Sequence, residues 1–156
     1  MKYLELKCPP PFVMIIALMI AVIASQRNLE FILQQAAILE NLVWPLLFAI
    51  AGAAIALAGV KEFKQRHTTL NPIHPERTSS LVTSGVYQLT RNPMYLGMLL
   101  VLLGWADFLD SFLAFGGALV FFGYISAFQI KPEEDMMKEK FDQGFVQYCS
   151  QVRRWL

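Results

Sequence analysis

Two tyrosines, an arginine and an Asn-Pro pair stand directly before an apolar segment in the second half of the chain. The stretch runs Leu81-Val-Thr-Ser-Gly-Val-Tyr-Gln-Leu-Thr-Arg-Asn-Pro-Met-Tyr-Leu-Gly97. Gly85 and Gly97 allow close backbone approach, and Pro93 suits the first turn of the helix that follows. An arginine beside a bilayer is costly unless it has an anionic partner. A chain that only spans a membrane does not need this chemistry, so we interpret the stretch as part of a binding site.

The composition indicates a membrane protein. Hydrophobic residues make up 56% of the chain, charged residues make up 16%, and the mean hydropathy is +0.46, unlike an ordinary soluble domain. The net charge of +1, without a basic aromatic patch, does not favour nucleic-acid binding. Cys8 and Cys149 have neither a metal-ligand spacing nor a disulfide framework. We expect one integral-membrane domain over residues 1–156, without a metal.

The elements that position this site are predicted to form an all-α, polytopic membrane helix bundle of about four spans. The apolar segments run from Pro11 to Ala24, from Leu42 to Val60, from Pro93 to Trp105 and from Phe112 to Ile130. The connection over residues 106–111 is so short that the last two segments must form a tight hairpin. We expect two N-terminal spans within residues 1–60 and a cofactor-binding, catalytic core over residues 61–156. The third segment is short unless Tyr95 and Trp105 lie at the two membrane interfaces.

The basic residues predict the orientation of the spans. Twelve of the thirteen lysines and arginines lie before the first segment, between the second and third, or after the fourth, and only Arg27 lies on the other side. Basic residues concentrate on the cytoplasmic side of membrane proteins. Both termini and the central loop are therefore predicted to face the cytoplasm, in a bacterial or archaeal cytoplasmic membrane. His67 and His74 lie in that polar loop, and their function stays open.

The C-terminal segment is predicted to be a cytoplasmic amphipathic helix. Pro132-Glu-Glu-Asp135 has the features of a helix start. Apolar residues then recur at helical spacing and form one stripe: Met137, Phe141, Phe145, Tyr148 and Val152. The helix should lie on the membrane surface or fold back over the central loop.

Together these motifs resemble the isoprenylcysteine carboxyl methyltransferase family, which is related to the phospholipid methyltransferases. The resemblance rests on Leu81–Tyr87, on Arg91–Gly97, on the hairpin, on Glu133-Glu134 with Phe141 and Tyr148, and on Val152-Arg-Arg-Trp155, in this order and spacing. It covers the chain from about Thr68 to Leu156, and the first two segments match only as hydrophobic helices. It identifies the chain as a small prokaryotic integral-membrane member.

The resemblance implies an enzyme that uses S-adenosylmethionine, bound from the cytoplasmic side, to methylate a lipophilic acceptor in the membrane. By position, the cofactor contacts it implies are Ser80, Leu81, Val82, Tyr87, Asn92, Pro93, Met94, Tyr95 and Glu133. Eukaryotic members have His at the position of Asn92, and an Arg, thought to meet the substrate, at the position of Gln129. Gln129 is thus the substrate-binding candidate, and a neutral amide there predicts poor use of prenylcysteine carboxylates.

The residue types suit these roles on physical grounds. Arg91 is able to pair a carboxylate, Glu133 to accept hydrogen bonds from an amine or from ribose hydroxyls, and tyrosine rings to face a cation. Glu134 is the candidate general base, although an acceptor that is already ionised needs none. Two of these residues also have a purely structural interpretation. Tyr95 is then an anchor at the membrane interface, and Arg91 a charge that extends from the edge of the membrane into water.

Two other functions stay open at this stage. One is an NADPH-dependent membrane reductase of sterol-like lipids, which shares a similar signature, and the other is a noncatalytic small membrane protein. No Gly-rich fingerprint of a soluble dinucleotide-binding domain is present in the sequence. Membrane lipids are expected partners of the protein. The group that accepts the methyl is left open among a carboxylate, a thiol, a phosphoethanolamine amine and a quinone-like hydroxyl.

Overall fold

Every regular element in the described part of the chain is a helix. The computed structural model describes residues 5–66 and 80–156. In chain order the elements are α1 (Pro10–Ser25), α2 (Leu29–Ala37), α3 (Leu39–Gln65), η3 (Gly85–Gln88), α4 (Pro93–Phe108), η4 (Phe112–Ala114), α5 (Phe115–Ile125), η5 (Ser126–Ile130) and α6 (Lys131–Gln151). The predicted all-α class is confirmed for these residues. His67 and His74 lie outside them.

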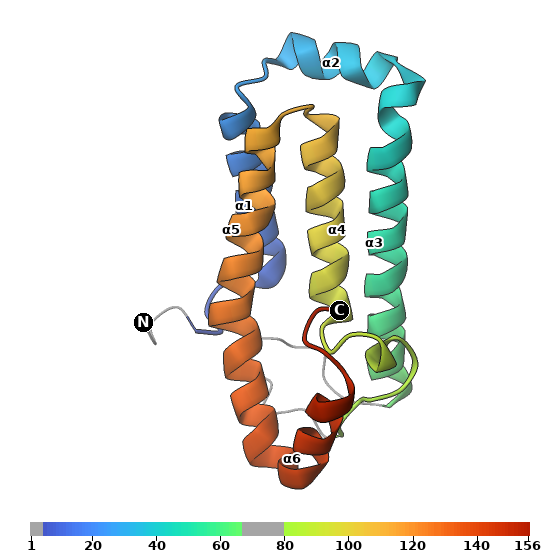
Figure 1. Cartoon of the computed structure of the whole chain (residues 1–156), viewed down its shortest axis with the longest axis vertical. Coiled ribbons are helices and arrows are strands. Elements are labelled where there is room, and N and C mark those ends of the chain that lie inside the picture. The colour runs from blue at the N-terminus through green and yellow to red at the C-terminus, as the bar shows by residue number, and fades with distance from the viewer. Residues whose placement is uncertain (1–4, 67–79) are drawn as a thin grey trace.

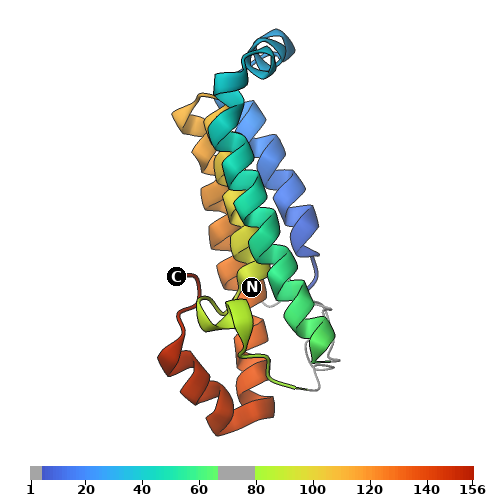
Figure 2. The ribbon, with the colours of Figure 1, turned by 90° about the vertical axis from the view of Figure 1, so that its right-hand side faces the viewer.

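Four of the helices lie side by side, with α4 at the centre (Figure 1). α4 contacts α3 on one side and both α1 and α5 on the other. α2 crosses one end of the bundle. α6 lies at the opposite end, where the chain turns back toward the start of α4 (Figure 2). We call these two ends the α2 end and the α6 end.

Small residues bring α3 and α4 into close contact. Gly52 lies against the backbone carbonyl of Gly97, and Gly97 in turn lies against Ala56. A Cβ added at Gly59 would approach the ring of Pro93 to 2.9 Å. Such contacts allow membrane helices to pack without large side chains between them. The start of α4, which carries the polar motif, is thereby held against α3.

Only one of the three glycines in the last apolar segment makes a close helix contact. Gly117 lies against the backbone of Ala17 and the side chain of Ala21 on α1. A Cβ added at Gly116 or Gly123 would meet nothing within 4 Å. The contact between α1 and α5 therefore depends on one face of α5, and the other two glycines lie on open faces.

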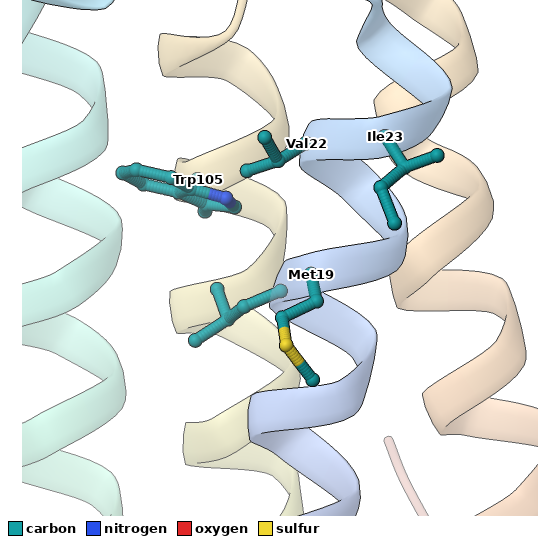
Figure 3. Close-up of a pocket in the computed structure, with 5 residues that line it drawn as sticks. Met19, Val22, Ile23 and Trp105 are labelled. Atoms are coloured by element: carbon teal, nitrogen blue, oxygen red, sulfur yellow. The ribbon is translucent and has the colours of Figure 1, made fainter. Parts of the chain in front are cut away.

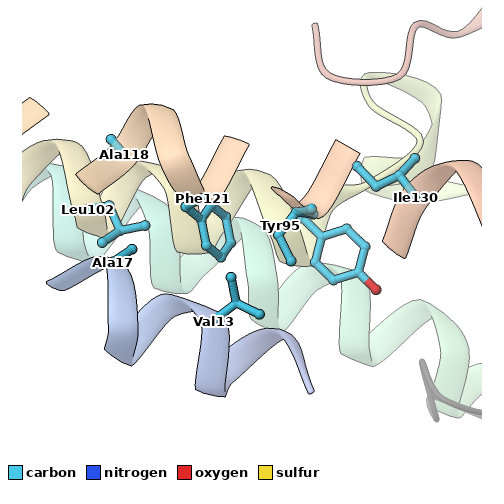
Figure 4. Close-up of a cluster of buried hydrophobic side chains, with 8 residues drawn as sticks. Val13, Ala17, Tyr95, Leu102, Ala118, Phe121 and Ile130 are labelled. Carbon is cyan, nitrogen blue, oxygen red and sulfur yellow. The ribbon is translucent and has the colours of Figure 1, made fainter. Parts of the chain in front are cut away.

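The core between α1, α4 and α5 is apolar and continues to the α6 end. Its buried members are Val13, Ala17, Tyr95, Leu102, Ala118, Phe121, Ile125 and Ile130 (Figure 4). Tyr95 is only 6% exposed. The Tyr95 ring therefore packs inside the bundle, and its position at a membrane interface stays a prediction.

The helix lengths support two or three spans rather than the four predicted. Within the described residues, α3 and the continuous helix Phe112–Gln151 are each long and apolar enough to cross a membrane. The bent pair of α1 and α2 makes a third if it counts as one span. α4 is apolar but has 16 residues, fewer than the roughly 20 that usually cross a bilayer. A helix does form at each predicted apolar segment, and four-span topology stays a prediction.

The short helix α2 was not predicted from the sequence. The side chain of Asn28 caps it by accepting a hydrogen bond from the backbone N–H of Phe31 (2.9 Å), and α2 is bent by 100° from α1. Arg27 holds this corner, because its guanidinium donates to the backbone carbonyls of Leu109 (3.3 Å) and Asp110 (2.7 Å). The one basic residue on this side thus joins the α1–α2 corner to the tip of the hairpin.

α5 continues into α6 through a π-helical turn, η5, without a break in the helix. The start of α6 at Lys131 lies next to the predicted start at Pro132, but it is not a free helix start. Proline lacks the N–H that would bond the carbonyl four residues earlier, here that of Phe128. The backbone N–H of Leu6 donates to this carbonyl instead (3.0 Å). The N-terminal segment therefore completes the hydrogen bonding of the turn.

The second half of α6 folds back over the segment that precedes α4, one of the two placements expected. The helix kinks at Asp142, whose backbone is non-helical (φ 44°, ψ −117°). Beyond the kink, the apolar stripe packs on residues of the central segment. The buried members of this cluster, which we call the cap, are Val82, Tyr87, Phe145, Tyr148 and Val152, and Met137 and Phe141 pack against it. The predicted stripe is confirmed as a packing face.

Candidate active site

Polar side chains from three parts of the chain meet at the α6 end. They come from the start of α4, from the junction of η5 with α6, and from the segment after α6, which returns toward α4 (Figure 2). The apolar core lies directly beside them. The site thus has a polar side and an apolar side.

A carboxylate, a phenol and an amide form the part of the site next to the core. The Tyr95 hydroxyl and the Gln129 side-chain amide both donate to Glu133 Oε1, each at 2.7 Å. Gln129 is 1% exposed, and Glu133 is partly buried. Both bonds reach the same oxygen, so the second oxygen, Oε2, receives neither of them. The arrangement presents one oriented carboxylate at the edge of an apolar core.

The π-helical turn sets the direction of Gln129. Turns of this kind insert an extra residue into a helix and are frequent at functional sites. Its first residue, Ser126, accepts a hydrogen bond from the indole N–H of Trp155 (3.2 Å), and the Trp155 ring lies 4.9 Å from that of Phe122. Together with the bond from Leu6 to Phe128, this contact ties both terminal segments to the turn that carries Gln129.

The second carboxylate, Glu134, lies between two guanidinium groups. Arg91 Nη2 donates to Oε1 at 2.7 Å, and Arg154 Nη2 donates to Oε2 at 2.6 Å. The side chains of Arg91 and Glu134 are 13% and 19% exposed, and that of Arg154 is 39% exposed. The hydrogen bond to Glu134 raises the pKa of Arg154. Both arginines stabilise the ionised form of Glu134, so this carboxylate is poorly suited to take up a proton as a base.

Arg91 and Asn92 also hold the end of the chain by its backbone. Arg91 Nη1 donates to the carbonyls of Val152 (3.0 Å) and Cys149 (3.3 Å). The side-chain amide of Asn92 donates to the carbonyl of Arg154 (2.9 Å). The Cys149 carbonyl lies in the last turn of α6, where a helix has no internal donors, and the carbonyls of Val152 and Arg154 follow that turn. Arg91 and Asn92, which directly precede α4, therefore satisfy backbone carbonyls at the C-terminal end of α6.

The cap closes the site on the side away from the bundle core. The Tyr148 hydroxyl donates to the backbone carbonyl of Tyr87 (2.6 Å), and the rings of Tyr87 and Phe63 lie 5.5 Å apart. Burial, with a smaller effect from Tyr148, raises the pKa of the Tyr87 hydroxyl. Tyr87 is therefore neutral in the physiological range and serves packing and hydrogen bonding, not acid–base chemistry.

The segment before η3 is fastened to the end of α3. The Ser84 hydroxyl donates to Glu62 Oε2 at 2.6 Å. Gly85 adopts a positive φ of 58°, which favours glycine, and a Cβ at this position would collide with the Glu62 carboxylate. Gly85 is thus required both for the turn and for the approach of Glu62.

Two donors at the α6 end are buried without a partner among the described residues. They are the Ser80 hydroxyl and Arg91 Nε. Buried polar groups without partners are rare and costly, and such groups suit a bound molecule with acceptor oxygens. A hollow of about 550 Å³ lies on the outer side of the cap, lined by Leu81, Thr83, Gln88, Gly144, Gln147, Tyr148, Gln151 and Val152.

Apart from Ser80, the predicted cofactor residues fall into four groups in space. Tyr95 and Glu133 join the predicted substrate residue Gln129, whereas Asn92 joins Arg91 beside the chain end. Leu81, Val82 and Tyr87 belong to the cap. Pro93 and Met94 lie against Gly59 of α3.

The part that sequence reasoning missed is the role of the chain end. Arg154 supplies half of the charge around Glu134, and Trp155 contacts the π-helical turn. Both residues belong to the motif Val152-Arg-Arg-Trp155, which by itself predicted only the orientation and the resemblance. The sequence did contain a signal for this contact. Two adjacent acids, Glu133 and Glu134, start one helix, and two arginines, Arg91 and Arg154, are available to pair with them.

A sequence model of one protein family, phospholipid methyltransferase, matches residues 41–144 of the chain. The match covers α3, the motif segment, the hairpin and the first part of α6. The chain belongs to the phospholipid methyltransferase family. An uncharacterized protein of Haemophilus influenzae is 43% identical to this family member over 63 residues, which cover 40% of this chain and 100% of the relative. No solved structure matches the chain.

Proposed function

We propose that this protein transfers a methyl group from S-adenosylmethionine to a lipophilic acceptor that reaches the site from the membrane. Membership of the phospholipid methyltransferase family supports methyl transfer as the reaction class. The observation that carries the proposal is the Glu133 carboxylate, oriented by Tyr95 and Gln129 at the boundary between the polar cluster and the apolar core.

The donor set at the α6 end fits the polar groups of this cofactor. Glu133 is placed to accept from an amine or from ribose hydroxyls, while Arg91 Nε and the Ser80 hydroxyl are buried donors without described partners. We assign the backbone around Leu81, Val82 and Asn92 to the walls of the same site. We assign Pro93 and Met94 to holding the start of α4 against α3.

When bound, S-adenosylmethionine supplies an electrophilic methyl group carried by a sulfonium. The chain orients the reactants and excludes water. The cap covers the polar side, and the core around Ile130 and Phe121 supplies an apolar side. A pre-oriented, dry site favours a displacement reaction in which charge is neutralised.

The ion pairs of Glu134 support a different role from the base expected for it. We assign Glu134, with Arg91 and Arg154, to positioning: the three residues hold the end of α6 against the start of α4, and thereby keep Glu133 in place one residue away. Gln129 is buried and donates to Glu133, so we assign it to orienting that carboxylate where it borders the acceptor.

The cofactor is tested by calorimetry on detergent-solubilised protein. We expect saturable binding of S-adenosylhomocysteine, the product form of the cofactor, and no binding of NADPH. The same titration on the Glu133→Gln variant gives the matched control. Binding of NADPH alone would replace the proposal with the membrane-reductase alternative, and binding of neither would favour a noncatalytic protein.

We further propose that the α6 end and both termini face the cytoplasm, as the basic residues indicate. The test replaces Cys8 and Cys149 by alanine and introduces single cysteines at Glu30 in α2 or at Lys64 at the end of α3, which are both exposed. In intact cells, a membrane-impermeant maleimide should label position 30 and not position 64. Permeabilised cells should label at both positions. Labelling of both positions in intact cells would contradict this orientation.

A further inference from the structure

An open groove runs along the last turns of α3, on the side of this helix that faces away from α4. Its lining residues follow one another at helical spacing and surround a space of about 420 Å³: Leu57, Val60, Lys61, Lys64 and Gln65. α4 packs on the opposite face of α3, where Gly52 and Gly59 make their close contacts. Figure 1 shows α3 at the edge of the row of helices. In a membrane, this groove therefore faces lipid.

The groove contains two positive charges and no negative one. Lys61 and Lys64 are three positions apart, which brings their side chains to the same face of the helix, and both are exposed. Glu62 is the one acid within residues 41–66, and it is engaged elsewhere, because its carboxylate accepts the hydrogen bond from Ser84. Neither lysine forms an ion pair with any residue that the structure describes. Two ammonium groups without an acid favour an anionic ligand.

The two lysines begin where the apolar part of α3 ends. The stretch from Leu42 to Val60 is about 28 Å long at 1.5 Å per residue, close to the roughly 30 Å of the apolar core of a bilayer. Ile50 and Leu57 are 64% and 67% exposed. They precede Lys64 by about four and about two helical turns, so the three side chains lie on one side of the helix. This side is thus apolar at the depth of acyl chains and basic at the depth of headgroups.

The apolar space between α1 and α4 provides a contrast. It measures about 380 Å³ and is lined by Leu18, Met19, Val22, Ile23 and Trp105 (Figure 3). None of these side chains is charged, so an anionic headgroup would gain no ion pair there. The groove on α3 combines an apolar surface with charge, and the charge determines which lipid it prefers.

We propose that the groove on α3 binds a phospholipid with a net negative headgroup. The phosphate lies between the ammonium groups of Lys61 and Lys64, and one acyl chain lies along Leu57 and Ile50. A zwitterionic headgroup fits less well, because its own ammonium group would lie beside the two lysines without an acid. Lysines next to a membrane span attract anionic lipids in this way. The site is on the face of α3 away from α4, so it is separate from Glu133 and does not depend on the methyl-transfer proposal.

The test compares two phospholipids that differ only in the headgroup. Delipidated protein in a nonionic detergent is titrated with palmitoyl-oleoyl phosphatidylglycerol or with palmitoyl-oleoyl phosphatidylcholine, and native mass spectrometry counts the bound lipid. We expect the native protein to bind the anionic lipid more tightly. A lysine that meets an anionic headgroup contributes about five-fold in affinity, so Lys61→Gln and Lys64→Gln should each reduce this preference about five-fold. The double variant should remove it.

A matched double variant separates the groove from the general positive charge of the α6 end. Lys131→Gln/Lys138→Gln removes two exposed lysines of α6, which is the same change in net charge, and should leave the preference for phosphatidylglycerol unchanged. Circular dichroism shows that each variant is folded. Equal affinity of the native protein for the two lipids would overturn the proposal, and so would an equal loss of preference in the two double variants.

Soluble glycerophosphoglycerol tests whether the acyl chains take part in binding. It carries the headgroup and its charge without acyl chains, so an excess of it should not displace phosphatidylglycerol from the native protein. Displacement would show a site for a soluble phosphate ester and would also overturn the proposal of a lipid site.

Discussion

Replacement of Arg91 by alanine is expected to lower the free energy of unfolding by about 2–4 kcal/mol, because it removes one of the two guanidinium partners of Glu134 and the donors to two backbone carbonyls. Arg91 is 13% exposed and pairs with Glu134, which is 19% exposed. The same guanidinium donates to the carbonyls of Cys149 and Val152. Removal of one side chain therefore breaks the contact between the start of α4 and the end of α6 at several points.

Thermal and denaturant unfolding in detergent, followed by circular dichroism, measures this loss. Arg153→Ala is the matched control, because the Arg153 side chain is exposed and lies one residue from Arg154. The control is expected to change the free energy of unfolding by less than about 0.5 kcal/mol. Equal stability of the Arg91→Ala and Arg153→Ala variants would refute the structural role of Arg91.

A double variant separates the ion pair from the backbone contacts of Arg91. In Arg91→Ala/Glu134→Ala, the carboxylate that has lost one of its two guanidinium partners is gone, so part of the lost stability should return relative to Arg91→Ala alone. The part that does not return belongs to the bonds with the carbonyls of Cys149 and Val152.

Glu133→Gln is expected to lower the affinity for S-adenosylhomocysteine about tenfold or more, with little effect on folding. A charge-assisted hydrogen bond contributes on the order of 1.5–3 kcal/mol, which corresponds to this change in affinity. The substituted amide still offers an oxygen to the donors of Tyr95 and Gln129. The variant thus removes the negative charge and retains a carbonyl acceptor at the same place.

Calorimetry with the native protein, Glu133→Gln and Tyr95→Phe measures this effect. Tyr95→Phe should weaken binding less, because it removes only one of the two bonds that orient the carboxylate. Glu139→Gln serves as a control for the loss of one acidic charge, since Glu139 is exposed on α6. If binding is the same in all four proteins, Glu133 is not part of the cofactor site.

Much of the fold was predictable from local patterns in the sequence. A helix forms at each of the four apolar segments, the hairpin turn falls within 106–111, and the stripe from Met137 to Val152 packs as predicted. These features depend on hydrophobic runs, on helical spacing and on turn residues, which act over a few positions. The same local signals missed α2, whose nine residues are too few and too mixed to form an apolar segment.

The contacts within the site were less predictable than the residues that make them. Arg91, Glu133, Glu134, Tyr95 and Gln129 were all identified as candidates from the sequence. Their pairing was not: Glu134, the candidate base, lies between two arginines, and Tyr95, a predicted cofactor contact, packs in the core and donates to Glu133. The residue types indicated polar chemistry at the α6 end, but they could not indicate which donor meets which acceptor.

The sequence by itself determined the helical class, the order of the helices, the side of the bundle that carries the charges and the family resemblance, because each follows from composition or short motifs. The tertiary structure alone decided that Tyr95 meets Glu133 across 38 positions and that Arg91 meets Glu134 across 43. Such contacts depend on how far each helix extends and how it rotates against its neighbours. Here the glycine contacts between α3 and α4 and the π-helical turn before α6 set those positions, and neither effect is visible in a local pattern of residues.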